Sequence, residues 1–473
     1  MRPEDGGGND RVQDELTEAF ASLRAASRRD RIPDAETRKR RLSALKRLVI
    51  ESRDEIAAAI DADFGGRARA ETELMEIVPL LTALRHASRS LRRWMRDERR
   101  PVALTFQPSR AWVRHEPLGV IGILSPWNYP LLLALGPLVD ALAAGNRALI
   151  KPSELSPEFS RLLARLVSAH FQPDEVAVVT GGVEVAQAFA ALPFDHLFFT
   201  GSTEVGRKVM AAAAPNLTPV TLELGGKSPA IIAPDYPLEK AVRSLLLGKF
   251  TNAGQTCIAP DYVLAPAEKA EALAREILAS VQRAYPDPQT DAQFTNVITA
   301  RHRERLVAAI DAARDAGATI LQVGGAGQNG KVPPTVVLNA PEGSLLLTEE
   351  IFGPVLPIIA YRDLDEALAF INARSRPLAL YAFTNDRAAR AKILDGAISG
   401  GVTLNGTLLH IAQDGLPFGG VGDSGMGAYH GRDGFRRFSH ARAVYKPGFL
   451  NAFEHMGPPF GRLADLAIRF LGR

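Results

Sequence analysis

The middle of the chain alternates short apolar runs with longer helical ones, and this pattern constrains the fold more than any other feature of the sequence. Apolar runs that are typical of strands occur at residues 120–124, 147–150, 175–179, 196–199, 220–224 and 230–232. Helical runs follow several of them, at residues 131–144, where Gly145 ends the helix, and from about Val183 and Ser202. Such alternation predicts βαβ units and a parallel sheet. Five or more strands of this kind predict an open doubly wound sheet, which binds ligands beyond the carboxyl ends of its strands.

A second α/β unit is expected after Cys257. Its predicted elements are helices at residues 268–284, 300–316, 363–373 and 387–394 and strands at residues 335–338 and 355–360. The tail at residues 458–473 carries an apolar stripe that we expect to pack on the body or on a partner subunit.

The first hundred residues are predicted to be mainly helical. Apolar side chains at three-to-four spacing predict a helix over residues 36–63, ended by Gly65, and a second helix over residues 71–99. The stronger alternation of residues 102–116 predicts an extended, hairpin-like excursion. Residues 1–10, with three consecutive glycines, are expected to form a mobile start.

Composition places the chain among multidomain globular proteins. Its 473 residues correspond to roughly three units of about 150 residues each. The 56 basic and 53 acidic residues give a net charge of +3, without the single-sign field of a nucleic-acid binder. A single cysteine excludes an internal disulfide framework and fits a reducing, cytoplasmic setting. We find no cleavable leader and no apolar run long enough to span a bilayer, and we expect no metal site.

The single cysteine, Cys257, lies in polar surroundings. A lone cysteine is more often a small packing residue than a chemical group. Here, however, it follows Asn252-Ala253-Gly254-Gln255-Thr256, which supplies polar side chains and a glycine that permits close backbone approach. The flanks therefore favour a reactive thiol.

The segment at residues 198–206 brings glycine and hydroxyl groups to the point where a predicted strand meets a predicted helix. Amide donors at a helix start, with Gly201 and Ser202, suit a pyrophosphate, although Ser202 could simply cap the helix. A G-x-G-x-x-G match also occurs at residues 420–425. We discount this match because it neither follows a convincing strand nor opens a helix.

Charged and amide side chains end three other predicted strands. Lys151 and Glu154 could bind ribose hydroxyls, and the carboxylate would repel a 2′-phosphate; the alternative is a surface ion pair. Glu223 follows an apolar strand, where burial would raise its pKa toward that of a general base, unless it is merely a surface charge. Asn128 could donate its amide to an oxyanion.

One further segment, residues 348–354, supplies a carboxylate, Glu350, and an aromatic ring, Phe352. Together, a thiol, a base, an amide donor, a ribose-binding carboxylate and a phosphate-binding helix start suit the covalent oxidation of an aldehyde. The thiolate adds to the carbonyl, a nicotinamide accepts hydride, and water hydrolyses the remaining thioester.

With these motifs the sequence resembles the aldehyde dehydrogenase superfamily from its first predicted helix to about His440. Five matching motifs occur in the expected order, at residues 125–130, 199–206, 222–227, 254–257 and 350–354. The resemblance implies an α/β fold with a Rossmann-type cofactor domain, an α/β catalytic domain and a small β bridging or oligomerisation element.

The resemblance also implies roles for individual residues. The nucleophile would be Cys257, the general base Glu223, and the oxyanion hole Asn128 with the Cys257 backbone amide. Residues implied to bind the cofactor are Lys151 and Glu154 at the adenine-side ribose, Gly201 and Ser202 at the pyrophosphate, Trp127 along the cleft, and Glu350 and Phe352 at the nicotinamide ribose and ring. Glu154 favours NAD, and class 3 relatives with a glutamate here also accept NADP.

Within the superfamily, several segments are similar to the class 3 and coniferyl-aldehyde dehydrogenase branch. These segments are residues 257–262, Asn405, and residues 410–413, 417–427 and 429–431. The branch implies aromatic or medium- to long-chain aldehyde substrates and a homodimer. Gly406 departs from the branch, which has an acidic or larger residue there, and the tail lacks the spanning segment of membrane-bound relatives.

The resemblance further implies a division into domains. The cofactor domain would comprise residues 11–101 and 117–224, the catalytic domain 225–412, the bridging element 102–116 and 428–446, and the tail 447–473. Two alternatives remain on the residues alone: a cysteine-dependent esterase or amidase without redox chemistry, and a non-catalytic protein on the same scaffold.

Overall fold

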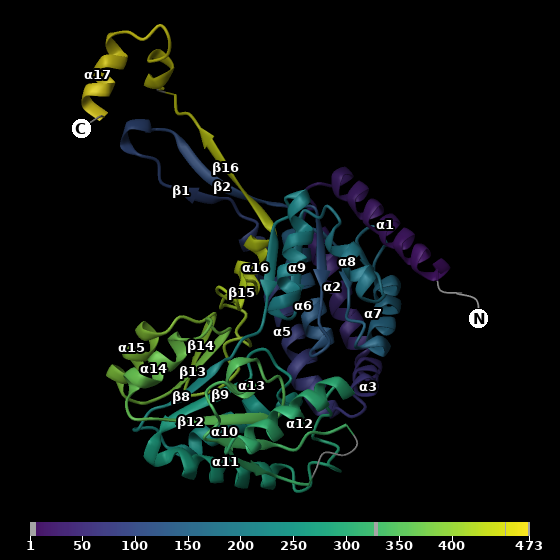
Figure 1. Cartoon of the computed structure of the whole chain (residues 1–473). Coiled ribbons are helices and arrows are strands. Elements are labelled where there is room, and N and C mark those ends of the chain that lie inside the picture. The colour runs from purple at the N-terminus through teal and green to yellow at the C-terminus, as the bar shows by residue number, and fades with distance from the viewer. Residues whose placement is uncertain (1–5, 326–329, 450, 472–473) are drawn as a thin grey trace.

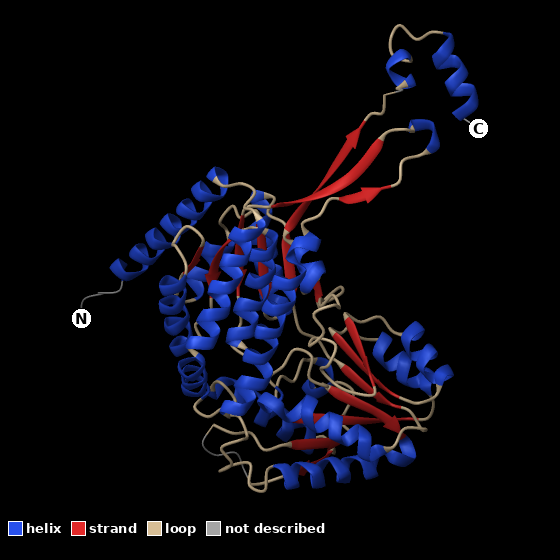
Figure 2. Ribbon diagram, turned by 180° about the vertical axis from the view of Figure 1, so that it is seen from behind, coloured by secondary structure: helices blue, strands red, loops and turns tan. Residues whose placement is uncertain are grey.

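The computed structural model describes residues 6–325, 330–449 and 451–471. Three β-sheets organise these residues (Figure 1). A six-stranded and a seven-stranded sheet form the body, and a three-stranded sheet forms an arm that projects from it (Figure 2). The expected α/β fold class is therefore confirmed.

The six-stranded sheet has the order β15-β7-β6-β3-β4-β5, and only β15 runs antiparallel to its neighbour. Its strands are β3 (Val120–Leu124), β4 (Arg147–Lys151), β5 (Val176–Val178), β6 (His196–Thr200), β7 (Val220–Glu223) and β15 (Gly425–Met426). Alternate side chains of β3 enter different cores: Ile121 and Ile123 pack on one face, Val120 and Leu124 on the other. Because helices cover both faces, the strands read as continuous apolar runs.

Helices from the first 213 residues cover this sheet. One face is covered by α2 (Ala35–Glu51), α3 (Arg53–Phe64), α5 (Val78–Trp94), α6 (Pro130–Ala144) and α7 (Pro157–His170). The other face is covered by α1 (Gly6–Arg29), α8 (Val183–Ala190) and α9 (Thr203–Ala213). A short helix, α4 (Arg69–Thr72), leads through a π-helical turn (Glu73–Ile77) into α5. Gly145 ends α6 in the left-handed conformation at φ 94°, as expected.

The seven-stranded sheet has the order β10-β11-β12-β9-β8-β13-β14 and is parallel except for β10. Its strands are β8 (Pro229–Ile232), β9 (Tyr262–Pro266), β10 (Thr319–Gln322), β11 (Thr335–Leu338), β12 (Val355–Tyr361), β13 (Ala379–Phe383) and β14 (Gly401–Leu404). Its helices are α10 (Leu238–Phe250), α11 (Ala270–Ala284), α12 (Ala300–Asp315), α13 (Leu345–Thr348), α14 (Leu364–Asn372) and α15 (Arg387–Gly396). Cys257 lies between α10 and β9, in the body and close to the first sheet's strand ends.

The arm contains β1 (Glu98–Arg100), β2 (Arg110–Pro117) and β16 (Ser439–Lys446). The helix α16 (Gly431–Arg437) connects the body to β16, and α17 (Arg462–Leu471) lies at the far end of the arm (Figure 1). Short 3-10 helices occur at Leu104–Phe106, Ala214–Asn216, Thr251–Gly254, Ala267–Lys269 and Ala452–His455. No helix among the described residues has the length and apolarity that crossing a membrane requires.

Several boundaries predicted from the sequence are wrong. The helix expected over residues 36–63 is two helices, because Ser52 leaves the helical conformation (φ −110°, ψ 17°) and redirects the chain. The helix expected over residues 71–99 ends at Trp94, and residues 98–100 pair with β2 instead. In the excursion at residues 102–116, the strand begins only at Arg110.

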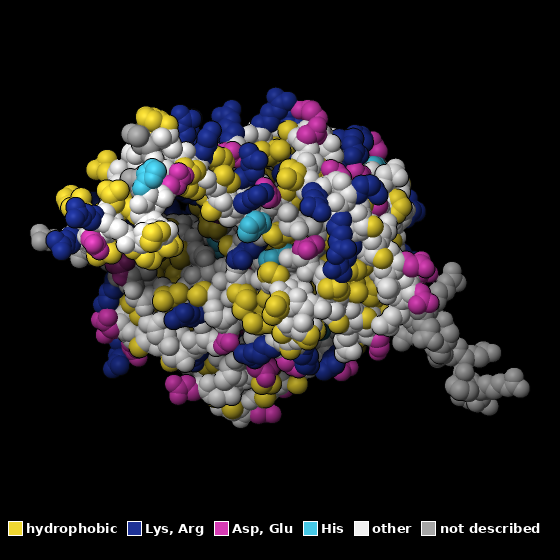
Figure 3. Space-filling model, turned by 90° about the horizontal axis from the view of Figure 1, so that it is seen from above, with side chains coloured by type: hydrophobic (Ala, Val, Ile, Leu, Met, Phe, Trp, Pro, Cys, Tyr) yellow, Lys and Arg dark blue, Asp and Glu magenta, His cyan; other side chains and the backbone are white. Residues whose placement is uncertain are grey.

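The two ends also differ from expectation. Of the expected mobile start, residues 1–5 lie outside the described residues, and Gly6 begins α1. The apolar stripe of the tail does not pack on the body: Leu466 is 67% exposed and Phe470 79% exposed on α17. Figure 3 shows hydrophobic side chains at the surface of this end of the molecule. The other expectation, packing of this stripe on a partner subunit, stays a prediction.

Candidate active site

One cavity of about 870 Å³ brings together every site residue predicted from the sequence. Its lining includes Trp127, Asn128, Lys151, Glu154, Gly201, Ser202, Glu223, Cys257, Glu350 and Phe352. The cavity opens at the carboxyl ends of the parallel strands, since Leu124, Lys151, Thr200 and Glu223 are the last residues of β3, β4, β6 and β7. This is the edge at which a doubly wound sheet binds its ligands.

A left-handed turn delivers Cys257 to the cavity. Asn252, Ala253 and Gly254 have φ values of 52°, 49° and 74°, a conformation that side chains other than glycine rarely adopt. At Gly254 a Cβ atom would collide with the carbonyl group of Gly353, so only glycine fits. Such strained backbone persists where surrounding contacts hold it.

Buried amides hold this turn against the loop that follows β3. The side-chain amide of Asn252 donates to the carbonyl of Asn128 at 2.9 Å, and the side-chain amide of Gln255 donates to the carbonyls of Asn252 and Asn296 at 2.9 Å each. The Asn128 amide donates to the carbonyl of Gln255 at 3.1 Å. Because an amide nitrogen carries two N–H donors, Asn128 keeps one for another acceptor.

Burial shifts the pKa values of the two reactive groups upward. Desolvation, with the charges of Glu350 and Glu223, raises the pKa of the Cys257 thiol to about 12. Desolvation also raises the pKa of Glu223 well above its ordinary value, and neither of its carboxylate oxygens has a partner among the described residues. A thiol with a raised pKa and a buried carboxylate without a partner thus line one cavity, which marks a functional site.

Lys151 and Glu154 form the ion pair expected at the end of β4, with a separation of 2.8 Å. Lys151 is buried and Glu154 is about 40% exposed in its side chain. Burial acts to raise the pKa of Glu154, but the hydrogen bond from Lys151 holds it below its ordinary value. The carboxylate is therefore ionised at neutral pH and faces the cavity.

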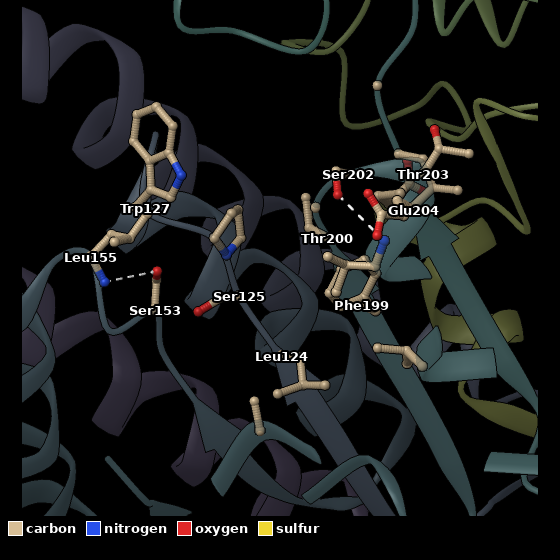
Figure 4. A pocket seen from close by; sticks show the side chains of 18 of the residues that line it. Leu124, Ser125, Trp127, Ser153, Leu155, Phe199, Thr200, Ser202, Thr203 and Glu204 are labelled. Carbon is tan, nitrogen blue, oxygen red and sulfur yellow. Dashed lines mark hydrogen bonds between the residues drawn. The ribbon is translucent and has the colours of Figure 1, made fainter. Parts of the chain in front are cut away.

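Gly201 and Ser202 lie where β6 gives way to α9. Ser202 is across the cavity from Trp127 (Figure 4). The Ser202 hydroxyl accepts a hydrogen bond from the Val205 backbone at 3.4 Å, so it does cap the helix. A Cβ atom at Gly201 would collide with the Phe199 ring. The missing side chain leaves the helix start open to the cavity, where amide donors favour an anion.

Glu350 and Phe352 close the other end of the cavity. Desolvation, with the charge of Asp261, raises the pKa of Glu350 to about 8, and its Oε1 atom has no partner among the described residues. Phe352 has a φ of 50°, and its ring meets the Trp127 ring edge-on at 5.5 Å. A bulky residue in this conformation is strained, as is common at binding sites.

The structure adds supporting residues that sequence reasoning missed. The fully buried Arg67 pairs with Glu76 at 3.0 Å and donates to the carbonyl of Asn128 at 3.3 Å. Glu76 in turn accepts from the backbone of Leu131 at 2.8 Å at the start of α6. Tyr129 bonds Thr256 at 2.8 Å, beside the thiol. In the sequence, Arg67 and Glu76 are two separate charges. Nothing marks them as a buried ion pair, because many such charges are exposed.

A second cavity, of about 350 Å³, has no lining residue in common with the first. Tyr429 lines this cavity, and the charges of Glu223 and Cys257 contribute to raising its pKa after desolvation. The wall is mainly apolar, and its large exposed hydrophobic members are Leu74, Val78, Leu247 and Leu409. Neither Gly406 nor His410 lines it.

The residues of the first cavity fit a nicotinamide dinucleotide. An ion pair that presents a carboxylate suits ribose hydroxyls, an open helix start suits a pyrophosphate, and the unpartnered Glu350 oxygen suits a second ribose. The glycine-rich match at residues 420–425 does not belong to this set: it forms a tight turn whose Gly425 pairs with Glu223 across β15 and β7. Discounting it was correct.

Comparison with known proteins extends this picture to the whole chain. The model of the aldehyde dehydrogenase family matches residues 9–444. The probable coniferyl aldehyde dehydrogenase of Pseudomonas aeruginosa is 48% identical over 448 residues, which cover 95% of this chain and 94% of that protein. The dimeric NADP-preferring aldehyde dehydrogenase of Rattus norvegicus is 40% identical over 93% of this chain and 94% of that protein.

Solved structures give the same answer. The substrate-bound state of Staphylococcus aureus AldH superposes with a TM-score of 0.91 at 35% identity, covering 96% of this chain and 99% of that one. Fold and matches together define an oxidoreductase that uses NAD(P). The chain belongs to the aldehyde dehydrogenase family, in its class 3 and coniferyl-aldehyde branch, and it is an NAD(P)-dependent aldehyde dehydrogenase. The esterase and non-catalytic alternatives are not favoured.

Proposed function

We propose that Cys257 is the nucleophile of this aldehyde oxidation, Glu223 the general base and Asn128 an oxyanion donor. The observation that carries the proposal is that a thiol, a carboxylate without a partner and an amide with a free N–H line one cavity. None of these residues would identify the reaction by itself. Together they supply the nucleophile, the general base and the oxyanion donor that covalent aldehyde oxidation needs.

The proposed reaction uses these residues in turn. The Cys257 sulfur attacks the aldehyde carbon as its thiol proton passes to solvent, and the carbonyl oxygen is stabilised by the free N–H of Asn128 and the backbone amide of Cys257. Bound NAD(P) supplies the hydride acceptor for the chemistry at this carbon. Glu223 then takes a proton from the water that attacks the thioester, which releases the acid and restores the thiol. Burial strengthens Glu223 as a base once it is ionised, because it raises its pKa.

The proposed cofactor contacts follow the cavity from end to end. Lys151 and Glu154 would hold the adenine-side ribose, Gly201 and Ser202 the pyrophosphate, Trp127 the cleft wall, and Glu350 and Phe352 the nicotinamide ribose and ring. The ionised Glu154 supports a preference for NAD, since it would repel a 2′-phosphate. The ratio of kcat/KM with NAD to that with NADP tests the preference.

The proposed substrate is an aromatic aldehyde such as coniferyl aldehyde, or a medium- to long-chain aliphatic one. Support comes from the mainly apolar second cavity, whose Tyr429 has its pKa raised in part by the charge of Cys257, and from the relative named as a probable coniferyl aldehyde dehydrogenase. The test is the formation of reduced cofactor with coniferyl aldehyde, hexanal and acetaldehyde. A clear preference for acetaldehyde would contradict the proposal, because a small aldehyde gains little from an extended apolar cavity.

The remaining expectations concern assembly and domain division. We propose a cytoplasmic homodimer, supported by the projecting arm and by the dimeric relative. The proposed division is a cofactor domain at residues 11–101 and 117–224, a catalytic domain at 225–412, a bridging element at 102–116 and 428–446, and a tail at 447–473. Light scattering of the purified protein tests the dimer: a monomer's mass, about 51 kDa, would contradict it.

A further inference from the structure

The second cavity contains an imidazole that has no hydrogen-bond partner. Among the described residues, nothing bonds to either ring nitrogen of His430, and its Nδ1 atom is shut off from solvent. A buried polar group without a partner is costly, and native proteins contain few of them. Because Nδ1 has no accessible surface, Nε2, which also lacks a partner among the described residues, is the ring nitrogen that a ligand in this cavity can reach.

The ring of His430 is held in one position. It stacks on Phe418 at 5.5 Å with an interplanar angle of 18° and meets Tyr429 edge-on at 4.3 Å. Its backbone has a φ of 83°, and its backbone N–H donates to the buried Asp140 at 3.1 Å. A polar group fixed in this way loses little conformational entropy when it binds.

A second histidine on the other face of Phe418 provides the contrast. His410 stacks on that ring at 5.9 Å, but its Nδ1 pairs with the Thr403 hydroxyl at 2.8 Å. It does not line the second cavity. Of these two stacked histidines, only His430 lines the second cavity.

The chemistry of the cavity defines the group that would bind there. Burial lowers the pKa of His430 to about 4, so the ring is neutral at pH 7 and offers one donor and one acceptor nitrogen. A neutral ring holds an anion poorly, whereas a hydroxyl matches it because it can both donate and accept. The rest of the wall is mainly apolar, which suits the ring and side chain of an aromatic molecule.

We propose that His430 is a specificity-determining residue, whose imidazole hydrogen-bonds the phenolic hydroxyl of a 4-hydroxycinnamaldehyde-type substrate. This inference rests on the proposed substrate class and narrows it from aromatic aldehydes to phenolic ones. Thr82, His86, Asp140, Asp414 and Tyr429 also bring polar groups to this cavity, and they provide the competing assignments.

The test compares 4-hydroxycinnamaldehyde with cinnamaldehyde, which lacks only the hydroxyl. We expect the ratio of their kcat/KM values to be about ten- to a hundredfold higher in the wild type than in His430→Phe, which keeps the ring and removes both nitrogens. Dividing one ratio by the other removes the electronic effect of the hydroxyl on the aldehyde. Activity of His430→Phe on cinnamaldehyde within about threefold of the wild type would show that the variant is folded.

Three further variants complete the design. His430→Asn keeps a polar group and tolerates a positive φ, so it should retain part of the discrimination and is informative even if the phenylalanine variant does not fold. His410→Leu removes the imidazole outside the cavity and should leave the ratio unchanged. His86→Leu should also leave it unchanged; loss of discrimination in this variant instead of His430→Phe would overturn the assignment.

The outcomes separate this inference from the proposed function. Equal ratios in the wild type and His430→Phe would refute the role of His430 while aldehyde oxidation stands. Oxidation of hexanal without oxidation of either cinnamaldehyde would refute the aromatic substrate class, and the inference with it. Absence of activity with all three would refute the proposed function itself.

Discussion

The shielded thiol leads to a quantitative prediction about its reactivity. With a pKa of about 12, the Cys257 thiolate at pH 7.5 is roughly 3.5 orders of magnitude scarcer than that of an ordinary cysteine, whose pKa is about 8.5. A thiolate of higher pKa is intrinsically more nucleophilic, with a Brønsted coefficient of about 0.4–0.5, which offsets about half of the logarithmic difference. Alkylation in the absence of cofactor should therefore be about a hundredfold slower than for a free thiol.

Intact mass after treatment with iodoacetamide measures this rate cleanly, because the chain has one cysteine. The rate should rise about tenfold per pH unit from pH 7 to pH 10, since the thiolate population grows in that proportion below the pKa. Above about pH 8, where Glu350 is ionised, the profile of Glu350→Gln should move to lower pH, because a negative charge that disfavours the thiolate is gone. Glu154→Gln, at the other end of the cavity, is the matched control and should not move it. A plateau at or below pH 8 would refute the shielded thiol.

Three further predictions concern the neighbours of the thiol. Asn128→Ala should lower kcat by roughly 10²–10³ if its free N–H is an oxyanion donor, and a change below about threefold would assign it a structural role. Glu154→Gln should raise kcat/KM with NADP relative to NAD, because the carboxylate no longer repels a 2′-phosphate; an unchanged ratio would remove Glu154 from cofactor selection. Arg67→Met should destabilise the fold by about 3–5 kcal/mol in urea unfolding, since it leaves Glu76 buried without its partner, and a loss below about 1 kcal/mol would contradict that pairing.

Sequence reasoning located the parallel sheets and the site because both depend on local patterns. The strands β3 and β4 are continuous apolar runs covered on both faces, so their ends, and the polar residues there, could be read directly. Cys257 stood out because it is the only sulfhydryl and has polar flanks. The collinear motifs then supplied the family, which the comparisons confirmed.

Features that depend on long-range contacts could not be predicted in this way. The break at Ser52 has no proline or glycine to signal it, and the exposed stripe of α17 has the same period as a buried one. In the sequence, Arg67 is one more charge in the connection between two predicted helices, until the fold buries it beside Glu76 and Asn128. His430 belonged to a recognised motif, but only the second cavity reveals that its ring nitrogens lack partners.

The central claim is that Cys257 forms a covalent intermediate and Glu223 assists its hydrolysis. Rapid mixing of enzyme and NAD with benzaldehyde tests it by following reduced cofactor during the first turnover. The wild type and Glu223→Gln should each give a burst that approaches one equivalent per active site, with a much slower steady state in Glu223→Gln, whereas Cys257→Ala should give no burst. A burst in Cys257→Ala, or its equal loss in Glu223→Gln, would contradict the account.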